Sequence, residues 1–501
     1  MTLDRRDFLR LSALSGAAAA TGIAAAPRSA TAAAAPTRPR VLLRGGYILT
    51  MDAALGDLRG DVLIDNGKIA AVGKNLKASD AAIVDASDAL VIPGFIDSHR
   101  HSWQSQVRQL AFDWPFLRYL QDMFGKFGTN YRPEDVYAGV LLGRLTAING
   151  GVTTMLDWSH IMNSPQHADA NLQALRDAGG RSVFAMGWPQ TPNPALWIQK
   201  STRDLPDDIR RVRKQYFASN SGLVTLQMAG RGPSFAVPEQ VAKDLATARD
   251  LGLHTTMHVG GNGPIIEMAK AKLLGPDITW VHLVTATDEE ITALKDAGCT
   301  TSVSPAGEEW HTAWHGPTPA TIRLLSHGIT PSLSPDTEAF GPGDMFAVMK
   351  ATLGSARYAA ANPQDTNAQP PGGSPPQQFN GANQIPIRKI LEMATVAGAP
   401  TVELDGKVGT LAPGKLADIV MLRMSSLNYF PVNDPAGAIV GSADTSCVDA
   451  VFVNGKAVKF NGKLVDQALE KRARRLALDS RNWLYAKAGM TPPDGLQNEK
   501  L

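Results

Sequence analysis

Two histidines separated by one residue, His99 and His101, are the strongest chemical feature of this sequence. They end the segment 91–101, which begins with an apolar run and Pro-Gly. Successive side chains of an extended strand point to opposite faces, so both imidazoles share one face and Arg100 points away. A catalytic zinc site uses about three protein ligands and keeps one position open. The spacing therefore predicts a metal-binding pair at the end of a buried strand.

Further candidate ligands end other apolar segments. Of the ten histidines, His258 and His282 each end a separate strand-like run, and Asp336 follows another run at 329–333. A structural role is the better interpretation of any single histidine. Because several independent runs end in side chains that bind metals, the set as a whole favours one shared site.

Eight strand-like segments alternate with helical segments through the middle of the chain. The first ends at His99, and the others are 152–157, 182–186, 223–228, 253–258, 278–282, 300–304 and 329–333. The helical segments between them include 168–178, 238–252 and 288–298. Eight β/α repeats predict an α/β fold with a (β/α)8 TIM barrel, whose chemistry lies at the carboxyl ends of the strands.

Short strands of a second kind flank the barrel on both sides. On the N-terminal side they lie between residues 41 and 92, and on the C-terminal side they include 419–422 and 448–453. Asn-Gly pairs at 66–67 and 454–455 indicate hairpin turns. We expect both halves to join in one small composite β-sandwich domain into which the barrel is inserted. Residues 362–383, rich in Pro, Gly, Gln and Asn, predict a long surface loop, with a lid and disorder as the two interpretations.

The N-terminal segment predicts an export signal. Arg5 and Arg6 precede a mildly apolar run, and small residues at 29–32 offer cleavage sites. This pattern is typical of twin-arginine signal peptides, so we expect the twin-arginine translocon as a partner and a secreted or periplasmic mature protein. A disordered alanine-rich tail is the alternative. The run is too short and too rich in Gly and Ala for a stable membrane anchor. The expected boundaries are the signal peptide at 1–35, sandwich halves at 36–93 and 401–466, the barrel at 94–400, and a C-terminal helix and tail at 467–501.

Composition excludes several other classes of protein. The 501 residues are 44% hydrophobic and 19% charged, with a formal net charge of +2, as in a soluble globular protein. No basic patch with interleaved aromatic residues is present, which excludes nucleic acid as a partner. The two cysteines, Cys299 and Cys447, cannot form a disulfide framework and are expected to be small buried residues. A small-molecule substrate is the partner that remains.

Several motifs together resemble the amidohydrolase superfamily, in particular its cytosine deaminase and triazine hydrolase branch. The resemblance covers essentially the whole mature sequence, and the motifs that carry it lie at 66–73, 91–101, 149–157, 281–290, 304–305, 394–399 and 409–418. It implies an amidohydrolase that cleaves a carbon–nitrogen bond other than a peptide bond, in an amide, cyclic amide or amidine-like group. It also implies a homo-oligomer.

The resemblance further implies a set of site residues. One divalent ion would be held by His99, His101, His258 and Asp336. Zinc suits this nitrogen-rich set, with Fe²⁺ or Mn²⁺ as alternatives. Strand four, at 225–230, lacks the lysine that bridges two metals in some members, so one ion is expected. Metal binding lowers the pKa of water from about 15.7 toward 7. The catalytic residues would be Asp336, which accepts a proton, and His282, which polarises the substrate oxygen.

One position departs from the family pattern. The family's deaminases carry glutamate three residues after the strand-five histidine, whereas Gly261 stands at that place after His258. Glycine cannot transfer a proton, which puts simple purine or pyrimidine deamination in doubt. The substitutes within the predicted site are Glu308, Glu309, Glu338 and His160, each of which has a solvated loop residue as its plainer interpretation.

Aromatic residues near the predicted strand ends favour a flat, conjugated or heteroaromatic substrate, with barrel-rim packing as the alternative. The residues expected to contact substrate are Trp103, Gln104, Trp158, His160, Glu308, Glu309 and Trp310. Arg100 and Arg231 are candidates to meet an anionic group.

Three functions stay open on these residues. The first is an exported metal-dependent hydrolase of carbon–nitrogen bonds. The second is a lyase or isomerase on the same scaffold, which keeps every ligand and does not need the absent glutamate. The third is an exported, non-catalytic binder of a small molecule, although a binder has no need of an open metal position.

Overall fold

The computed structural model describes residues 34–259, 263–308, 318–361 and 385–492. The predicted export signal, apart from its last two residues, and the loop predicted at 362–383 lie outside this part of the chain. None of the described helices is long and apolar enough to cross a membrane.

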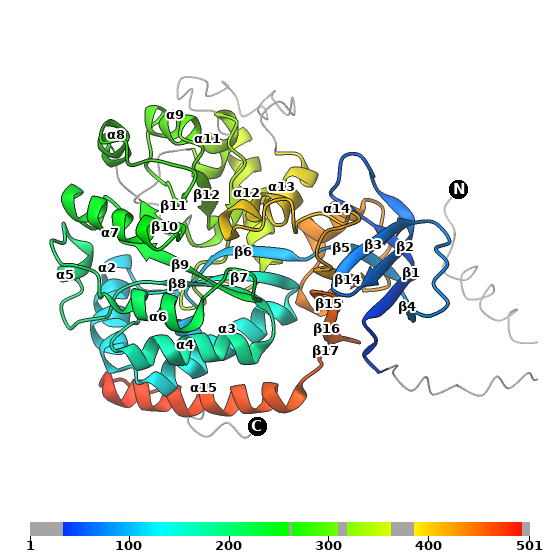
Figure 1. The fold of residues 1–501 in the computed structure, drawn as a ribbon, viewed down its shortest axis with the longest axis horizontal. Coiled ribbons are helices and arrows are strands. Elements are labelled where there is room, and N and C mark those ends of the chain that lie inside the picture. Colours follow the sequence, from blue (N-terminus) through cyan, green and yellow to red (C-terminus); the bar gives the residue numbers. More distant parts are fainter. Residues whose placement is uncertain (1–33, 260–262, 309–317, 362–384, 493–501) are drawn as a thin grey trace, which may run out of the picture. The chain divides into compact units, whose positions relative to one another are not determined.

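Eight parallel strands form the barrel, each paired with its neighbour in sequence (Figure 1). They are β6 (Phe95–Arg100), β7 (Val152–Ser159), β8 (Arg181–Met186), β9 (Val224–Gly230), β10 (Thr255–Val259), β11 (Ile278–His282), β12 (Thr300–Val303) and β13 (Ser332–Leu333). Strands β6, β7 and β8 are buried along their whole length, as expected for a parallel sheet covered on both faces. The predicted TIM-barrel fold and its eight strands are confirmed.

The barrel closes where the chain beyond β13 meets β6. The backbone N–H of Asp336 donates to the carbonyl of His99 at 3.2 Å, and the N–H of His101 donates to the carbonyl of Asp336 at 2.8 Å. Earlier along both segments, the hydroxyl of Ser332 donates to that of Ser98 at 2.7 Å. Strand β13 is only two residues long, so these contacts, which we call the closing seam, complete the barrel.

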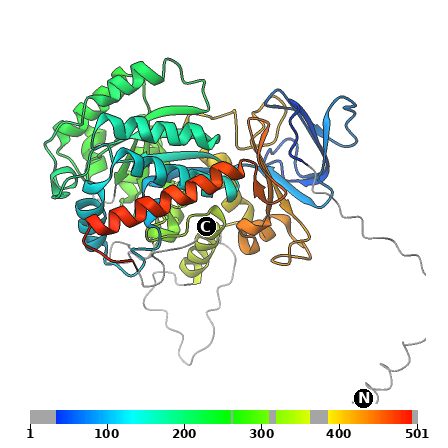
Figure 2. The same ribbon diagram turned by 90° about the horizontal axis from the view of Figure 1, so that it is seen from below.

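Helices cover the outside of the barrel and connect its strands. The described helices are α2 (Phe116–Tyr119), α3 (Pro133–Asn149), α4 (Pro165–Ala178), α5 (Ala195–Ile198), α6 (Asp208–Tyr216), α7 (Pro238–Asp250), α8 (Pro264–Lys270), α9 (Asp288–Asp296), α10 (Pro305–Glu308), α11 (Ala320–Ser326), α12 (Met345–Ala361), α13 (Ile387–Met393), α14 (Pro435–Gly437) and α15 (Gln467–Lys487). Proline starts α3, α4, α7 and α8, where its missing N–H breaks no helical bond. The C-terminal helix α15 lies along α3 (Figures 1 and 2).

A nine-stranded mixed sheet contains strands from both ends of the chain. Its strands are β1 (Arg40–Ile48), β2 (Leu58–Asp65), β3 (Lys68–Gly73), β4 (Ala82–Asp85), β5 (Ala89–Pro93), β14 (Ile419–Arg423), β15 (Val448–Val453), β16 (Lys456–Phe460) and β17 (Lys463–Leu464). The antiparallel pair β5–β14 joins the two halves. Both halves contribute to one apolar core, which includes Val41, Val62, Ile419 and Phe452. The predicted composite β domain is therefore present.

Asp418 ties this sheet to the barrel. Its carboxylate accepts two hydrogen bonds from Arg181, the first residue of β8, at 2.9 and 3.1 Å, and both side chains are buried. It also accepts from the N–H of Asn454 at 2.8 Å, while its carbonyl accepts from the N–H of Gly94 at 2.9 Å. Because Asp418 ends the motif at 409–418, this contact explains what that motif does in the fold.

We expect Asp418→Ala to destabilise the protein by about 3–5 kcal/mol, because it leaves the Arg181 guanidinium buried without its partner. Urea unfolding followed by circular dichroism measures this loss. The matched control is Asp277→Ala, which removes a similar bond pair to Arg249 at a site where both side chains are about one-third exposed. That variant is expected to lose at most about 1 kcal/mol. Equal losses in the two variants would contradict this account of Asp418.

Candidate metal centre

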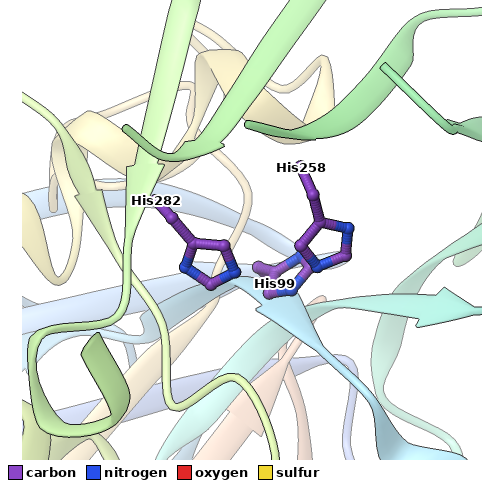
Figure 3. A group of neighbouring side chains, drawn as sticks. All are labelled: His99, His258 and His282. Carbon is purple, nitrogen blue, oxygen red and sulfur yellow. The ribbon is translucent and has the colours of Figure 1, made fainter. Parts of the chain in front are cut away.

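Three histidines from separate barrel strands point toward one another (Figure 3). His99 comes from β6, His258 from β10 and His282 from the end of β11. The ring centroid of His99 lies 4.7 Å from that of His258 and 5.5 Å from that of His282. One nitrogen of each ring lies within 4.8 Å of the corresponding atoms of the other two, close enough for a single ion to reach all three.

His101 and Asp336 join the same site through the closing seam. The Oδ1 atom of Asp336 lies 3.4 Å from Nε2 of His99 and 3.3 Å from Nε2 of His101. The structure thus brings together all four residues predicted as ligands, together with the predicted catalytic residue His282.

The backbone at two of these residues adopts the left-handed region. The φ angle is 76° at His282 and 65° at Asp336. Asp and His enter this region more readily than most residues, although it remains uncommon. Such strain persists only where the surrounding structure enforces it, and it gathers at functional sites.

A buried hydrogen bond fixes the orientation of His101. Its Nδ1 lies 2.8 Å from the carbonyl oxygen of Trp158, so Nδ1 carries the proton and donates, which leaves Nε2 for the shared site. The neighbouring Asp157 accepts hydrogen bonds from the Ser102 hydroxyl and from the Asn171 amide, the latter at 2.7 Å. Burial raises the pKa of Asp157 to about 6 in spite of these hydrogen bonds.

The protonation state of the cluster suits a divalent ion. Burial lowers the pKa of His99 to about 3 and that of His258 well below its usual value, which keeps both rings neutral. Burial alone would raise the pKa of Asp336, but the surrounding imidazoles outweigh it and hold the pKa below its usual value. Among the described residues, Nδ1 of His99 and Nδ1 of His258 have no hydrogen-bond partner. Neutral imidazoles and a carboxylate are the forms that bind metals, so these residues fit the expected ion.

His282 differs from the other imidazoles because a carboxylate faces it. Its Nδ1 lies 2.9 Å from Oε1 of Glu308, the last residue of α10, and Glu308 also accepts from the N–H of Ser304 at 2.6 Å. Burial alone would lower the pKa of His282, but Glu308 and Asp336 outweigh it and raise the pKa. The facing carboxylate favours a proton on Nδ1 of His282, and a histidine held in this way suits a group that polarises a substrate atom.

A cavity of about 500 Å³ opens onto the cluster, with His101, His258, His282 and Asp336 in its wall. Most of its other lining side chains are apolar, namely Phe116, Leu120, Phe124, Trp158, Trp188, Ile198, Phe235, Val259, Val284 and Phe340. A concave, mostly apolar space with a few convergent polar groups is typical of a small-molecule site.

The structure divides the residues predicted to contact substrate. Trp158, His160 and Glu308 line the cavity, whereas Trp103 and Gln104 do not. Both of the latter are fully buried behind the wall. The chain turns directly after His101 into the 3-10 helix η1 (Ser102–Val107), so the strand alternation assumed for them ends there. The remaining two, Glu309 and Trp310, lie outside the described residues, as does Gly261.

Two arginines and one glutamate predicted near the substrate serve the fold instead. Arg100 donates to Asp97 at 2.6 Å and to Glu338 at 2.9 Å, so Glu338 is not available as a proton donor. Arg231 forms a buried pair with Asp244 at 2.7 Å. Neither arginine lines the cavity, and the prediction that they meet an anionic group of the substrate is wrong.

Sequence reasoning missed one whole wall of the cavity. Phe116, Leu120 and Phe124 come from α2 and the π-helix η2 (Leu120–Phe127), which follow η1. They stand four residues apart, and that spacing is a signal of one apolar helical face.

Known proteins support this geometry. A sequence profile of the Amidohydrolase family matches residues 90–458. The 5'-deoxyadenosine deaminase of Methanothermobacter thermautotrophicus is 29% identical over 450 residues, which cover 86% of this chain and 95% of that protein.

Solved structures share the fold at lower sequence identity. An adenosine deaminase from Xanthomonas campestris with bound zinc is 19% identical with a TM-score of 0.72, and the match covers 88% of this chain and 98% of that one. The atrazine chlorohydrolase of Arthrobacter aurescens complexed with zinc is 20% identical with a TM-score of 0.71, and the match covers 87% of this chain and all of that one, 100%. With the profile match extending from β5 to β16, this chain belongs to the amidohydrolase family and is an enzyme that acts on carbon–nitrogen bonds other than peptide bonds.

Proposed function

We propose that this chain uses one divalent ion, zinc, to hydrolyse a carbon–nitrogen bond in a small, flat, heteroaromatic molecule. The ligands of the ion are His99, His101, His258 and Asp336. The observation that carries the proposal is the meeting of these side chains at the wall of an apolar cavity. Zinc in two solved structures of the same fold supports the choice of metal.

The residues of the site divide the chemical work among them. When bound, the ion supplies a Lewis acid that lowers the pKa of water from 15.7 to about 7. Asp336, held as a carboxylate, accepts the proton of the attacking water. His282, held by Glu308 through its Nδ1, donates a hydrogen bond to the substrate atom on which negative charge develops.

The leaving nitrogen needs a proton, and in this proposal Glu308 passes to it the proton that Asp336 has accepted from the attacking water. Glu308 lines the cavity and contacts His282 at 2.9 Å, so it lies beside the reacting group. It replaces the glutamate that the family's deaminases carry where this chain has Gly261. The aromatic walls, including Trp158 and Phe235, suit a flat ring that they contact on its faces.

Export through the twin-arginine translocon is the second part of the proposal. The paired arginines, the mildly apolar run and the small residues at 29–32 support it. This route carries folded proteins, which suits an enzyme that binds its metal before export.

We expect His258→Gln to lose most of the bound zinc and to lower turnover by at least about a hundredfold, because the remaining ligands cannot replace the missing imidazole. Elemental analysis measures the bound zinc. Turnover is measured as ammonia release from 5'-deoxyadenosine and aminotriazines and as ring opening of cyclic amides. The control is His254→Gln on the same strand segment, which loses only a hydrogen bond to Thr279. Full metal content and turnover in His258→Gln would refute the ligand set.

We expect Glu308→Gln to lower kcat by about 10²–10⁴ and to leave KM nearly unchanged, because proton transfer to the leaving group is lost. Glu308→Asp should recover part of kcat. Glu267→Gln on α8 is the control, because Glu267 is exposed, forms an ion pair with the exposed Lys270 and does not line the cavity. Wild-type kcat in Glu308→Gln would remove Glu308 from the mechanism. Products that contain no oxygen from labelled water would favour a lyase or isomerase.

Replacing Arg5 and Arg6 together by lysine should retain the folded protein in the cytoplasm of a bacterial host, because the translocon recognises the paired arginines. Cell fractionation followed by immunoblotting locates the protein. Wild-type protein that stays in the cytoplasm, or equal export of the variant, would contradict the export proposal.

A further inference from the structure

We infer that the substrate is uncharged and carries an apolar substituent on the side away from the metal centre, so that the cavity selects against anionic substrates. The inference depends on the proposed function for one point, namely that the reactive bond of the substrate faces the metal.

The cavity wall has two chemically different parts. Its polar part consists of His101, His258, His282, Glu308 and Asp336. Its apolar part includes Phe116, Leu120 and Phe124, together with side chains such as Ile198 and Phe340. A substrate that presents its reactive bond to the polar part must place the rest of its surface against hydrocarbon. Burial of an apolar substituent there is favourable.

Few polar side chains line the rest of the cavity. Among the described lining residues they are Tyr119, His160 and Ser234. The hydroxyl of Tyr119 is already engaged, since it accepts from the Gln104 amide at 2.8 Å and donates back to it at 3.1 Å. None of the three is a lysine or an arginine.

No lysine or arginine is present among the described lining residues. Arg118 lies on the same helical segment as Leu120, but its guanidinium packs over Trp114 at 4.5 Å and pairs with Asp122 at 3.2 Å. The internal segments 260–262, 309–317 and 362–384 contain no lysine or arginine either. The two charged side chains described in the wall are both carboxylates, Glu308 and Asp336.

The electrostatic consequence follows directly. An anionic substituent against the apolar part of the wall would lose its water and find no cation there, and a buried charge without a partner is strongly disfavoured. A hydrocarbon substituent of the same size meets no such penalty. Charge, more than shape, should therefore decide which substituents are accepted.

Two ligands that differ by one carboxylate, 9-benzyladenine and 9-(4-carboxybenzyl)adenine, test the expected selection against anionic substrates. Titration calorimetry on the zinc-loaded, full-length protein should show the neutral compound bound at least about tenfold more tightly. Leu120→Arg places a cation at the half-buried cavity wall and should shift this ratio by at least about tenfold toward the carboxylate. Leu117→Arg is the matched control, because Leu117 is 62% exposed and does not line the cavity. It should shift the ratio by less than about twofold, as exposed charges are screened.

The outcomes separate this inference from the proposed function. Equal or tighter binding of the carboxylate by the wild type, no binding of 9-benzyladenine, or equal shifts in the two arginine variants would each overturn the inference. Ammonia release is measured in the same samples. The expected binding ratios without release of ammonia from any amine tested would leave the inference intact and overturn the proposed hydrolysis.

Discussion

The hydrogen bonds between the backbone of Asp336 and the backbones of His99 and His101 are the contact on which this structure depends. They close the barrel, because β13 is too short to do so alone. They also bring the Asp336 carboxylate within 3.4 Å of both imidazoles. Closure of the barrel and assembly of the metal centre thus depend on the same contacts. A change that opens the closing seam would disperse the site without touching its ligands.

When no ion is bound, the buried ligand cluster at the closing seam lowers the stability of the folded protein. His99 and His258 each keep a ring nitrogen without a hydrogen-bond partner in the described part of the chain, and burial alone disfavours charge on both rings. Buried polar atoms that lack partners destabilise a fold by roughly 1–3 kcal/mol each. An ion that binds the folded state alone removes this penalty and stabilises the barrel by mass action. Metal binding and folding should therefore be coupled in this enzyme.

The sequence was sufficient for the barrel and for the placement of its polar strand ends, because strand periodicity and the common edge of parallel strands are local signals. The sequence was insufficient where the chain departs from the regular pattern of strands. Trp103 and Gln104 follow a strand in sequence but sit on a 3-10 helix that turns them behind the cavity wall. Arg100 and Arg231 looked available, since their carboxylate partners are recognisable only in three dimensions. The apolar residues of the wall at 116–124 follow one another at a four-residue spacing, which indicates one helical face. Because they lie many residues after the metal motif, the sequence did not show that this face lines the cavity.

Crystals grown with zinc and measured at the zinc absorption edge test the central claim most directly. The account predicts one anomalous peak at about 2.0–2.2 Å from nitrogens of His99, His101 and His258 and from a carboxylate oxygen of Asp336, the usual zinc bond lengths. A fully loaded crystal whose peak lies elsewhere, or whose peak contacts His99 and His101 without Asp336, would contradict it.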